Sequence, residues 1–257
     1  MRHIKRFILM IQFLTTIPIP YKIDCDEEDC GKGLAFAPVI GLLLGGMLTA
    51  FFFILKLFFS LGVISAFMLV IYILLTGGLH LDGLGDTFDG LFSNRPKERM
   101  LEIMRDSRIG TNALLGVVCI ILLDYSLLNA LPEAFFPRVI LLFPVAGRVG
   151  TLIGAGLSVY AREGEGLGKS FVHYCTIKEV FIGILIYFPF FFLVLGIDGL
   201  LVAFLTLLTA LIIVKFFSRK VNGVTGDILG AVCELNQTVF LIIICLYFRL
   251  IYGTTMG

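Results

Sequence analysis

Apolar residues in this chain gather into long, nearly uninterrupted stretches and do not alternate with polar ones as in a half-buried strand. A helix needs about 20 mostly apolar residues to cross a bilayer, and several stretches reach or approach that length. The pattern predicts an all-α, polytopic membrane helix bundle of about seven transmembrane helices, built as a single domain over residues 1–257. The approximate bounds of the stretches are 35–55, 57–76, 111–131, 136–160, 180–196, 200–217 and 228–252.

Lysine and arginine residues are concentrated in every second connection between these stretches. If the N-terminus is cytoplasmic, the connections on the far side of the bilayer keep only Lys56, Arg138 and Arg249. Cytoplasmic segments of membrane proteins carry such an excess of positive charge. The pattern therefore predicts a cytoplasmic N-terminus, with the long polar connections on the cytoplasmic side.

The composition supports a bilayer as the solvent of this chain. Hydrophobic residues make up 58% of it, charged residues only 15%, and the mean hydropathy is +1.01, whereas about 25% of the residues of a soluble domain are charged. The net charge of +1 argues against a nucleic-acid partner, which would favour a clearly basic face. The six cysteines show no paired spacing that would predict a disulfide framework.

The segment 76–94 carries the most informative chemistry, because it contains Asp82, Asp86 and Asp89. At about 100° per residue these positions share one narrow face of a helix. Neighbouring carboxylates repel one another and stay ionised together when a cation lies among them. Oxygen ligands suit Mg²⁺ or Mn²⁺, and Mg²⁺ typically combines one or two carboxylates with substrate phosphates. The aspartates are therefore predicted metal ligands for phosphoryl transfer, the alternative being a solvated turn.

His80 is either a catalytic base or ligand, or a satisfied interfacial side chain.

A second acidic group is predicted on the last apolar stretch, where Asp227 and Glu234 lie seven residues apart and share a helix face. We interpret Asp227 as a further metal ligand, although an acid that opens a helix also favours the helix dipole. Either Asp89 or Glu234 is interpreted as the catalytic base. Asn222 and Thr225 precede this helix, where they either cap it or contact the substrate.

Several basic and hydroxyl side chains are candidates for contacts with substrate phosphates. A Ser-Arg pair before the third stretch would bind phosphate at a helix N-terminus, the alternative being a topology signal. A charged residue inside the fourth stretch is costly in a bilayer and usually functional, unless it reaches the interface. A glycine-rich basic loop over 161–178 is predicted to close over a nucleotide, the alternative being a solvated loop. The candidates are Asp106, Ser107 and Arg108 before the third stretch, Arg148 inside the fourth stretch, and Arg162, Lys169 and Ser170 in the glycine-rich loop.

Three segments of the chain resemble the cobalamin synthase family, the adenosylcobinamide-GDP ribazoletransferases. They are GGLHLDGLGDTFDGLFSN at 77–94, RMLEIMRDSRIGTNALLGVV at 99–118 and NGVTGDILGAVCE at 222–234. FLTTIPIP at 13–20 and FAPVIGLLLGG at 36–46 add to the resemblance, which spans nearly the whole chain. Gly85 and Phe88 depart from the family pattern, in which small residues such as alanine are expected.

The resemblance implies a late step in the synthesis of coenzyme B12. The family transfers the adenosylcobinamide phosphoryl moiety from adenosylcobinamide-GDP to α-ribazole, or to its 5′-phosphate, and releases GMP. It also implies Mg²⁺ as cofactor and a multi-pass position in the cell membrane, with the active site facing the cytoplasm. The partners would be these small-molecule substrates and the lipid bilayer, without nucleic acid, and a homo-oligomer is compatible with this interpretation.

Two other classes of protein remain as alternatives. A CDP-alcohol phosphotransferase also clusters aspartates on membrane helices, but its D-G-x2-A-R pattern is not matched after Asp82 and Gly83. A cation-coupled transporter would use the same acids, but functional polar groups of a transporter lie near the midplane and are reached from both faces.

Overall fold

The computed structural model describes residues 2–21, 24, 26–164 and 167–253. All of the regular secondary structure in these ranges is helical, which confirms the predicted all-α class. In chain order the helices are α1 (Arg2–Leu14), α2 (Glu27–Gly33), the 3-10 helix η1 (Leu34–Phe36), α3 (Ala37–Leu55), α4 (Leu61–Thr76), α5 (Leu79–Leu91), α6 (Lys97–Ile103), α7 (Thr111–Asn129), α8 (Phe136–Gly156), α9 (Leu167–Tyr174), α10 (Ile177–Leu195), α11 (Ile197–Val221) and α12 (Gly226–Tyr252).

The helices that are long and apolar enough to cross a membrane agree with the predicted polytopic bundle. Within the described residues there are six such spans, and a bent pair of helices, α4 and α5, makes a seventh if it is counted as one span. The first span is a nearly continuous helical run over Glu27–Leu55, and the others are α7, α8, α10, α11 and α12.

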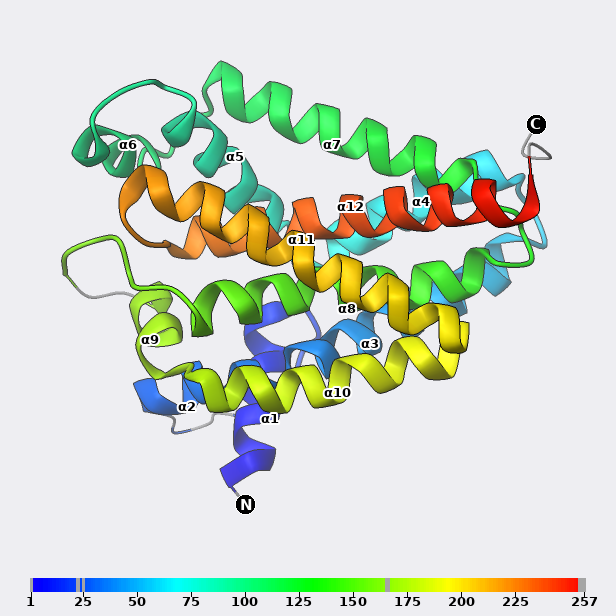
Figure 1. Ribbon diagram of the computed structural model, residues 1–257, viewed down its shortest axis with the longest axis horizontal. Helices are drawn as coiled ribbons and strands as arrows, with labels where there is room; N and C mark the ends of the chain where they lie inside the picture. Colours follow the sequence, from blue (N-terminus) through cyan, green and yellow to red (C-terminus); the bar gives the residue numbers. More distant parts are fainter. Residues whose placement is uncertain (1, 22–23, 25, 165–166, 254–257) are drawn as a thin grey trace.

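Helix α8 runs through the middle of the bundle (Figure 1) and is the most deeply buried span, with 89% of its apolar window buried against 28% for α7. It packs closely on α3 because two glycines of α3 leave room for its backbone. A Cβ atom on Gly41 would lie 2.6 Å from the Cα of Val145, and one on Gly45 would lie 2.0 Å from the carbonyl oxygen of Leu141. Small residues permit such close helix packing in membranes.

The sequence predicts several of the helix ends correctly. Gly196, with φ of +70°, separates α10 from α11 and produces the expected hairpin. Thr225 caps α12, as predicted, because its hydroxyl accepts a hydrogen bond from the Ile228 N–H at 3.2 Å. Asn222 instead ends α11, in the left-handed conformation. The short helix α6 begins directly after Pro96, which occupies its N-cap position.

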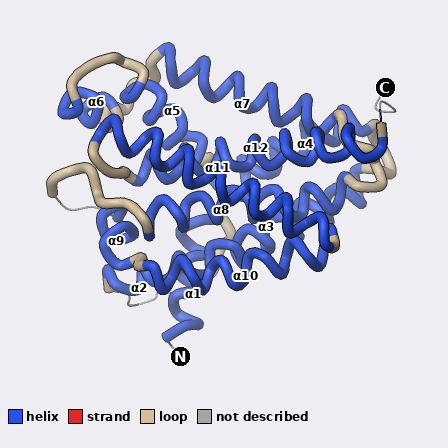
Figure 2. The backbone as a smooth tube through the Cα atoms, in the orientation of Figure 1, coloured by secondary structure: helices blue, strands red, loops and turns tan. Residues whose placement is uncertain are grey.

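The long connections gather at one end of the bundle, at the left of Figures 1 and 2. Helices α5, α6 and α9 lie at this end, together with the starts of α7 and α12. The opposite end holds short connections and the C-terminal end of α12. The polar segments that the sequence places on one side of the membrane are therefore gathered at one end of the molecule.

A sharp bend separates α4 from the aspartate-bearing helix α5. The two helix axes differ by 92°, and the turn consists of Gly77 and Gly78, which have φ of +63° and +69°. Glycine adopts this left-handed conformation without the steric penalty that a Cβ atom brings. The preceding helix end is tied to the N-terminal segment, because the Thr16 N–H donates to the Leu75 carbonyl at 2.8 Å.

The contact between α3 and α8 gives a test with a matched control. We expect Gly45→Ala to lower the free energy of unfolding by about 1–3 kcal/mol, because the new methyl group would push the two helices apart. Gly46→Ala, one residue further along α3, should be neutral, since nothing lies within 4 Å of its Cβ position. Thermal unfolding of the purified protein in detergent measures both. Equal losses in the two variants would contradict the close packing.

Candidate active site

The aspartate-bearing helix α5 crosses the start of α12 at two glycines. A Cβ atom on Gly83 would lie 2.8 Å from the carbonyl oxygen of Asp227, and one on Gly230 would lie 3.2 Å from the Cα of His80. A side chain at Gly83 would force the backbone of α12 to move, and one at Gly230 would need the backbone at His80 to give by a few tenths of an ångström. This crossing brings Asp82 on α5 next to Asp227 on α12, as predicted for two facing acidic groups.

A cleft of about 880 Å³ opens beside α5 and contains many of the predicted residues. One wall comes from α5 and the turn before it, and another comes from the segment between α6 and α7. Its polar lining residues are Thr76, Asp82, Asp86, Arg105, Asp106, Ser107 and Arg108. The structure thus brings the aspartates of one motif and the Asp-Ser-Arg segment of the next into one site.

The aspartates of the site differ in whether they have partners. Asp82 is exposed and Asp86 is half-buried, and within the described residues neither carboxylate accepts a hydrogen bond or joins an ion pair. Asp227 is paired instead, because its Oδ2 accepts from Arg162 Nη2 at 2.6 Å. Asp82 and Asp86 are therefore the acids available to a ligand in the cleft.

Asp89, by contrast, serves as the cap of α7. Its Oδ2 accepts from the Gly110 N–H at 2.6 Å and its Oδ1 from the Ala113 N–H at 2.9 Å. Both oxygens therefore satisfy backbone donors at a helix N-terminus. This placement corrects two expectations: Asp89 does not face the cleft as a free base, and the amide groups predicted to bind phosphate before α7 already have a partner.

Arg108 lies at the cleft as predicted, but it is paired with its neighbour. Its Nη2 donates to Asp106 Oδ2 at 2.6 Å, and both residues lie in the connection between α6 and α7. The hydrogen bonds from Arg108 lower the pKa of Asp106 to about 2, so that this carboxyl stays ionised at neutral pH. Arg108 is largely exposed, and an exposed ion pair contributes little to stability. The guanidinium can therefore exchange Asp106 for a phosphate at small cost.

Arg162 reaches Asp227 because two loops pair locally. The Val224 N–H donates to the Val159 carbonyl at 2.8 Å, and the Ala161 N–H donates to the Val224 carbonyl at 2.9 Å. This pairing holds the segment after α8 against the turn before α12. Arg162 is therefore a partner of a predicted metal ligand.

The rest of the predicted phosphate loop differs from the expectation. Residues 167–174 form the helix α9, and residues 165 and 166 lie outside the described residues. Lys169 is exposed, while Ser170 is buried and its carbonyl lies beside Gly31 of α2. Neither residue lines the cleft. Asn222 is exposed away from the cleft, and Thr225 is fully buried as a helix cap.

Arg148 and Glu234 meet in the interior of the bundle, away from the cleft. Both are almost completely buried. They share the hydroxyl of Tyr72, which accepts from Arg148 Nη1 at 3.0 Å and donates to Glu234 Oε1 at 2.9 Å. Gln237 donates to the second oxygen of Glu234 at 3.0 Å. We therefore correct two expectations: Arg148 is not placed to bind a phosphate in the cleft, and Glu234 does not complete the acidic group around Asp227.

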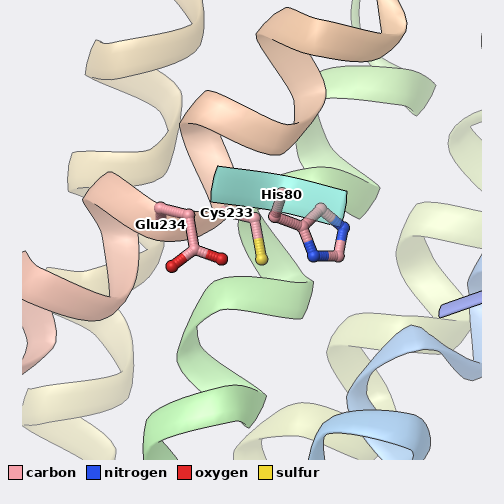
Figure 3. Close-up of side chains that lie close together, drawn as sticks. All are labelled: His80, Cys233 and Glu234. Carbon is pink, nitrogen blue, oxygen red and sulfur yellow. The ribbon is translucent and has the colours of Figure 1, made fainter. Parts of the chain in front are cut away.

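His80 lies beside this network. Figure 3 shows its ring next to the sulfur of Cys233 and the carboxylate of Glu234, with donor atoms of all three within 4.8 Å of one another. Arg148 Nη1 donates to Cys233 Sγ at 3.0 Å, so a guanidinium already supplies the positive charge in this cluster. Among the described residues this is the one group of three metal-type ligands so close together, and the aspartates do not form another. Asp82 and Asp86 can still contribute two carboxylates to a Mg²⁺ ion, whose remaining ligands would be oxygens of the substrate.

Several polar residues of the interior were not among the residues predicted from the sequence. Tyr72 and Gln237 complete the network, and Asp124 of α7 is buried with its Oδ1 lacking any hydrogen-bond partner among the described residues. Asp124 could have been found from the sequence, because an acidic residue in the middle of an apolar span is costly and usually functional. Tyr72 carried no comparable signal, since a lone tyrosine in an apolar stretch is common.

Fold and site together define a polytopic membrane protein with an acidic, phosphate-compatible cleft at one end. The chain belongs to the cobalamin-5-phosphate synthase family, whose model matches residues 6–245. It is 63% identical to the adenosylcobinamide-GDP ribazoletransferase of Acetivibrio thermocellus, over 96% of this chain and 100% of the relative. The relative of the same name from Clostridium acetobutylicum is 54% identical, over 97% of this chain and 100% of the relative. No solved structure matches the chain.

The interior network predicts a stability effect that depends on the shared hydroxyl. We expect Tyr72→Phe to lower the free energy of unfolding by about 1–3 kcal/mol, because it removes the hydroxyl that donates to Glu234 Oε1 and accepts from Arg148. Arg148→Met should cost about 3–5 kcal/mol, since Glu234 loses the positive charge of its network. In the double variant Arg148→Met, Glu234→Gln, the loss should be smaller than the sum of the single losses. Thermal unfolding in detergent measures all of them.

A buried tyrosine elsewhere provides the control. The hydroxyl of Tyr187 makes one long hydrogen bond, to the Ala203 carbonyl at 3.3 Å, so Tyr187→Phe should have a much smaller effect. If both tyrosine variants lose the same stability, and the Arg148 and Glu234 substitutions are additive, the network does not act as a unit.

Proposed function

We propose that this protein is an adenosylcobinamide-GDP ribazoletransferase. It would join the adenosylcobinamide phosphoryl moiety of adenosylcobinamide-GDP to α-ribazole or its 5′-phosphate and release GMP, late in cobalamin synthesis. The single observation that carries the proposal is the pair of unpartnered carboxylates, Asp82 and Asp86, in a cleft that also contains Ser107 and Arg108. The identity shared with the ribazoletransferases across nearly the whole chain supports this substrate class.

Asp82 and Asp86 would hold Mg²⁺, with Asp227 close by on the facing helix. The donor set fits this ion, because two free carboxylates and the oxygens of a substrate pyrophosphate suit a hard cation. When bound, Mg²⁺ would neutralise negative charge on the pyrophosphate and on the departing GMP. Arg162 holds the Asp227 carboxylate in position through its hydrogen bond.

The groups of this chain bind and orient the two substrates for an in-line displacement. The oxygen of a free ribose hydroxyl of the acceptor, other than the 5′-hydroxyl, forms a bond to the phosphorus that carries cobinamide, and the bond from this phosphorus to the bridging oxygen breaks, so that GMP leaves with that oxygen. Arg108 would release Asp106 and bind a phosphate oxygen. The proton of the hydroxyl would pass to a carboxylate where α5 meets α12, Asp82 or Asp227. Asp89 and Glu234 are less suited, because both oxygens of each already accept hydrogen bonds, whereas Asp227 accepts only through Oδ2 among the described residues.

We also propose that the cleft faces the cytoplasm and that the membrane is the cell membrane. The connections rich in lysine and arginine lie at the same end of the bundle as α5, α6 and α9. Such segments are retained on the cytoplasmic side of a membrane. Adenosylcobinamide-GDP is highly charged and water-soluble, so an enzyme that uses it needs this end in the compartment where nucleotides are made.

Removal of the free carboxylates tests the reaction. We expect Asp82→Asn and Asp86→Asn each to reduce the rate of GMP release from adenosylcobinamide-GDP and α-ribazole by at least about 100-fold, the range seen when transition-state charge loses a stabilising group. Thermal unfolding should stay near that of the wild type, since neither side chain has a partner in the fold. Chelation by EDTA should also stop GMP release, and added Mg²⁺ should restore it. Full activity in either variant would refute the metal assignment.

Reporter fusions test the orientation. Alkaline phosphatase is active only outside the cytoplasm, so we expect it to be inactive when fused after Lys97, in the connection beside the cleft. The same enzyme fused after the last residue should be active, because seven spans place the two termini on opposite sides. A green fluorescent protein fusion should give the reverse pattern at both positions. An active phosphatase at Lys97 would contradict the proposed orientation.

A further inference from the structure

A second, smaller cavity of about 150 Å³ lies behind the wall of the cleft. The two cavities share Phe13, Leu79 and Asp82, so Asp82 stands at the boundary between them. The lining of the smaller cavity is mostly apolar, with a few polar side chains. It consists of Phe13, Leu14, Leu34, Leu79, His80, Asp82, Gly83, Thr151, Gly168, Phe171, Gly226, Asp227, Leu229 and Gly230.

Two aromatic rings on separate helices form one wall of this cavity. The rings of Phe13 on α1 and Phe171 on α9 lie with their centroids 4.7 Å apart. Their helices are held in place by α2. Arg6 of α1 donates to Asp29 of α2 at 2.7 Å in a nearly buried ion pair, and Gly31 of α2 packs directly on the backbone of α9. The aromatic wall is therefore a fixed part of the fold.

The opposite side of the cavity is built where glycines bring backbones close together. A Cβ atom on Gly168 would lie 3.0 Å from the N atom of Gly226, at the contact between α9 and α12. Gly83 and Gly230 line the same cavity where α5 crosses α12. A cavity between aromatic rings and bare backbone suits a flat, largely apolar ligand.

The polar groups of the cavity are few and lie at two places. Asp82 and Asp227 lie where α5 crosses α12, and Asp82 also faces the cleft. His80 is buried, and its Nδ1 atom has no hydrogen-bond partner among the described residues. Thr151 of α8 also lines the cavity, and its hydroxyl makes a long hydrogen bond, 3.4 Å to the Leu229 carbonyl. A buried polar atom without a protein partner is available to hydrogen-bond a ligand in the cavity.

We propose that this cavity binds the aromatic base of the acceptor nucleoside, while the cleft binds the anionic donor. The base of ribazole is a flat, apolar benzimidazole with one free ring nitrogen, and its ribose carries the reacting hydroxyl. With the base against Phe13 and Phe171, the ribose lies at the boundary marked by Asp82, where the hydroxyl reaches the donor phosphorus. The ring nitrogen accepts a hydrogen bond from His80 or Thr151. The inference rests on the proposed function, which supplies the identity of the acceptor.

An acyl chain of a lipid fits the cavity less well. The carboxylates at the boundary of the cavity are unfavourable neighbours for hydrocarbon, and an acyl chain offers no hydrogen bond to the unpartnered His80 Nδ1. A hydroxylated nucleoside uses both features.

Substitution of the aromatic wall tests the inference. We expect Phe171→Leu to raise the KM for α-ribazole by about tenfold, since a base stacked on an aromatic ring is bound by roughly that factor or more. The KM for adenosylcobinamide-GDP should change by less than about twofold, and kcat at saturating acceptor by less than about threefold. Val172→Ala is the matched control, because Val172 is the next residue of α9, is buried, and does not line the cavity. It should leave both KM values unchanged.

Phe13→Leu provides an independent variant on another helix, and it should raise the acceptor KM in the same way. Its matched control is Phe7→Leu, since Phe7 lies on the same helix outside the cavity. The inference is overturned if neither aromatic variant changes the acceptor KM, or if both variants raise the KM of donor and acceptor equally.

Direct binding separates this inference from the proposed function. Equilibrium dialysis of radiolabelled α-ribazole against the wild type and the Phe171→Leu variant needs no turnover. Weaker binding by the variant, without transfer by the wild type, would support the cavity assignment and refute the proposed function. Transfer by the wild type with equal binding by both proteins would refute the cavity assignment and leave the function intact.

Discussion

The crossing of α5 and α12 is the constraint on which the site depends. The two helices approach so closely that a side chain at Gly83 would displace the partner helix and one at Gly230 would press on its backbone. The preceding bend at Gly77 and Gly78 turns the axis of α5 by 92° from that of α4. Asp82 and Asp86 therefore line a cleft at one end of the bundle. A straight continuation of α4 would have separated Asp82 from Asp227. Glycine at these positions is therefore a requirement of the site geometry.

The buried polar network shows how charge is tolerated in the interior of such a bundle. An isolated charge there is costly, and Arg148 and Glu234 reduce this cost by sharing the Tyr72 hydroxyl. The network connects α4, α8 and α12, so it fixes the spans from which the site is built. Its unpartnered atoms, which include Arg148 Nε and Nη2, show that these groups are not fully satisfied by the described protein atoms. Breaking a buried pair of this kind is more harmful than removing both partners.

Periodicity identified the acidic face of α5 but could not separate its members by role. Asp82, Asp86 and Asp89 share a helix face, yet Asp89 lies where the N-terminus of α7 offers free N–H groups, and it binds those groups. Likewise, the seven-residue spacing of Asp227 and Glu234 places them on one face of α12, but about two helical turns separate them along the axis. Asp227 consequently reaches the acidic site, whereas Glu234 lies in the interior network.

The amino-acid sequence by itself determined the helical class, the approximate spans, the cap at Thr225 and the aspartate motif, because all of these follow from local periodicity and backbone preference. The resemblance to the cobalamin synthase family also came from the sequence, through the order of the motifs along the chain. Only the tertiary structure decided which polar groups meet: Arg162 with Asp227, Arg148 with Tyr72, and Phe13 with Phe171. These partners are 65, 76 and 158 residues apart in the chain, the last being the difference between 171 and 13. Local patterns do not encode such pairs, since they depend on how glycine contacts and the bend before α5 place whole helices against one another.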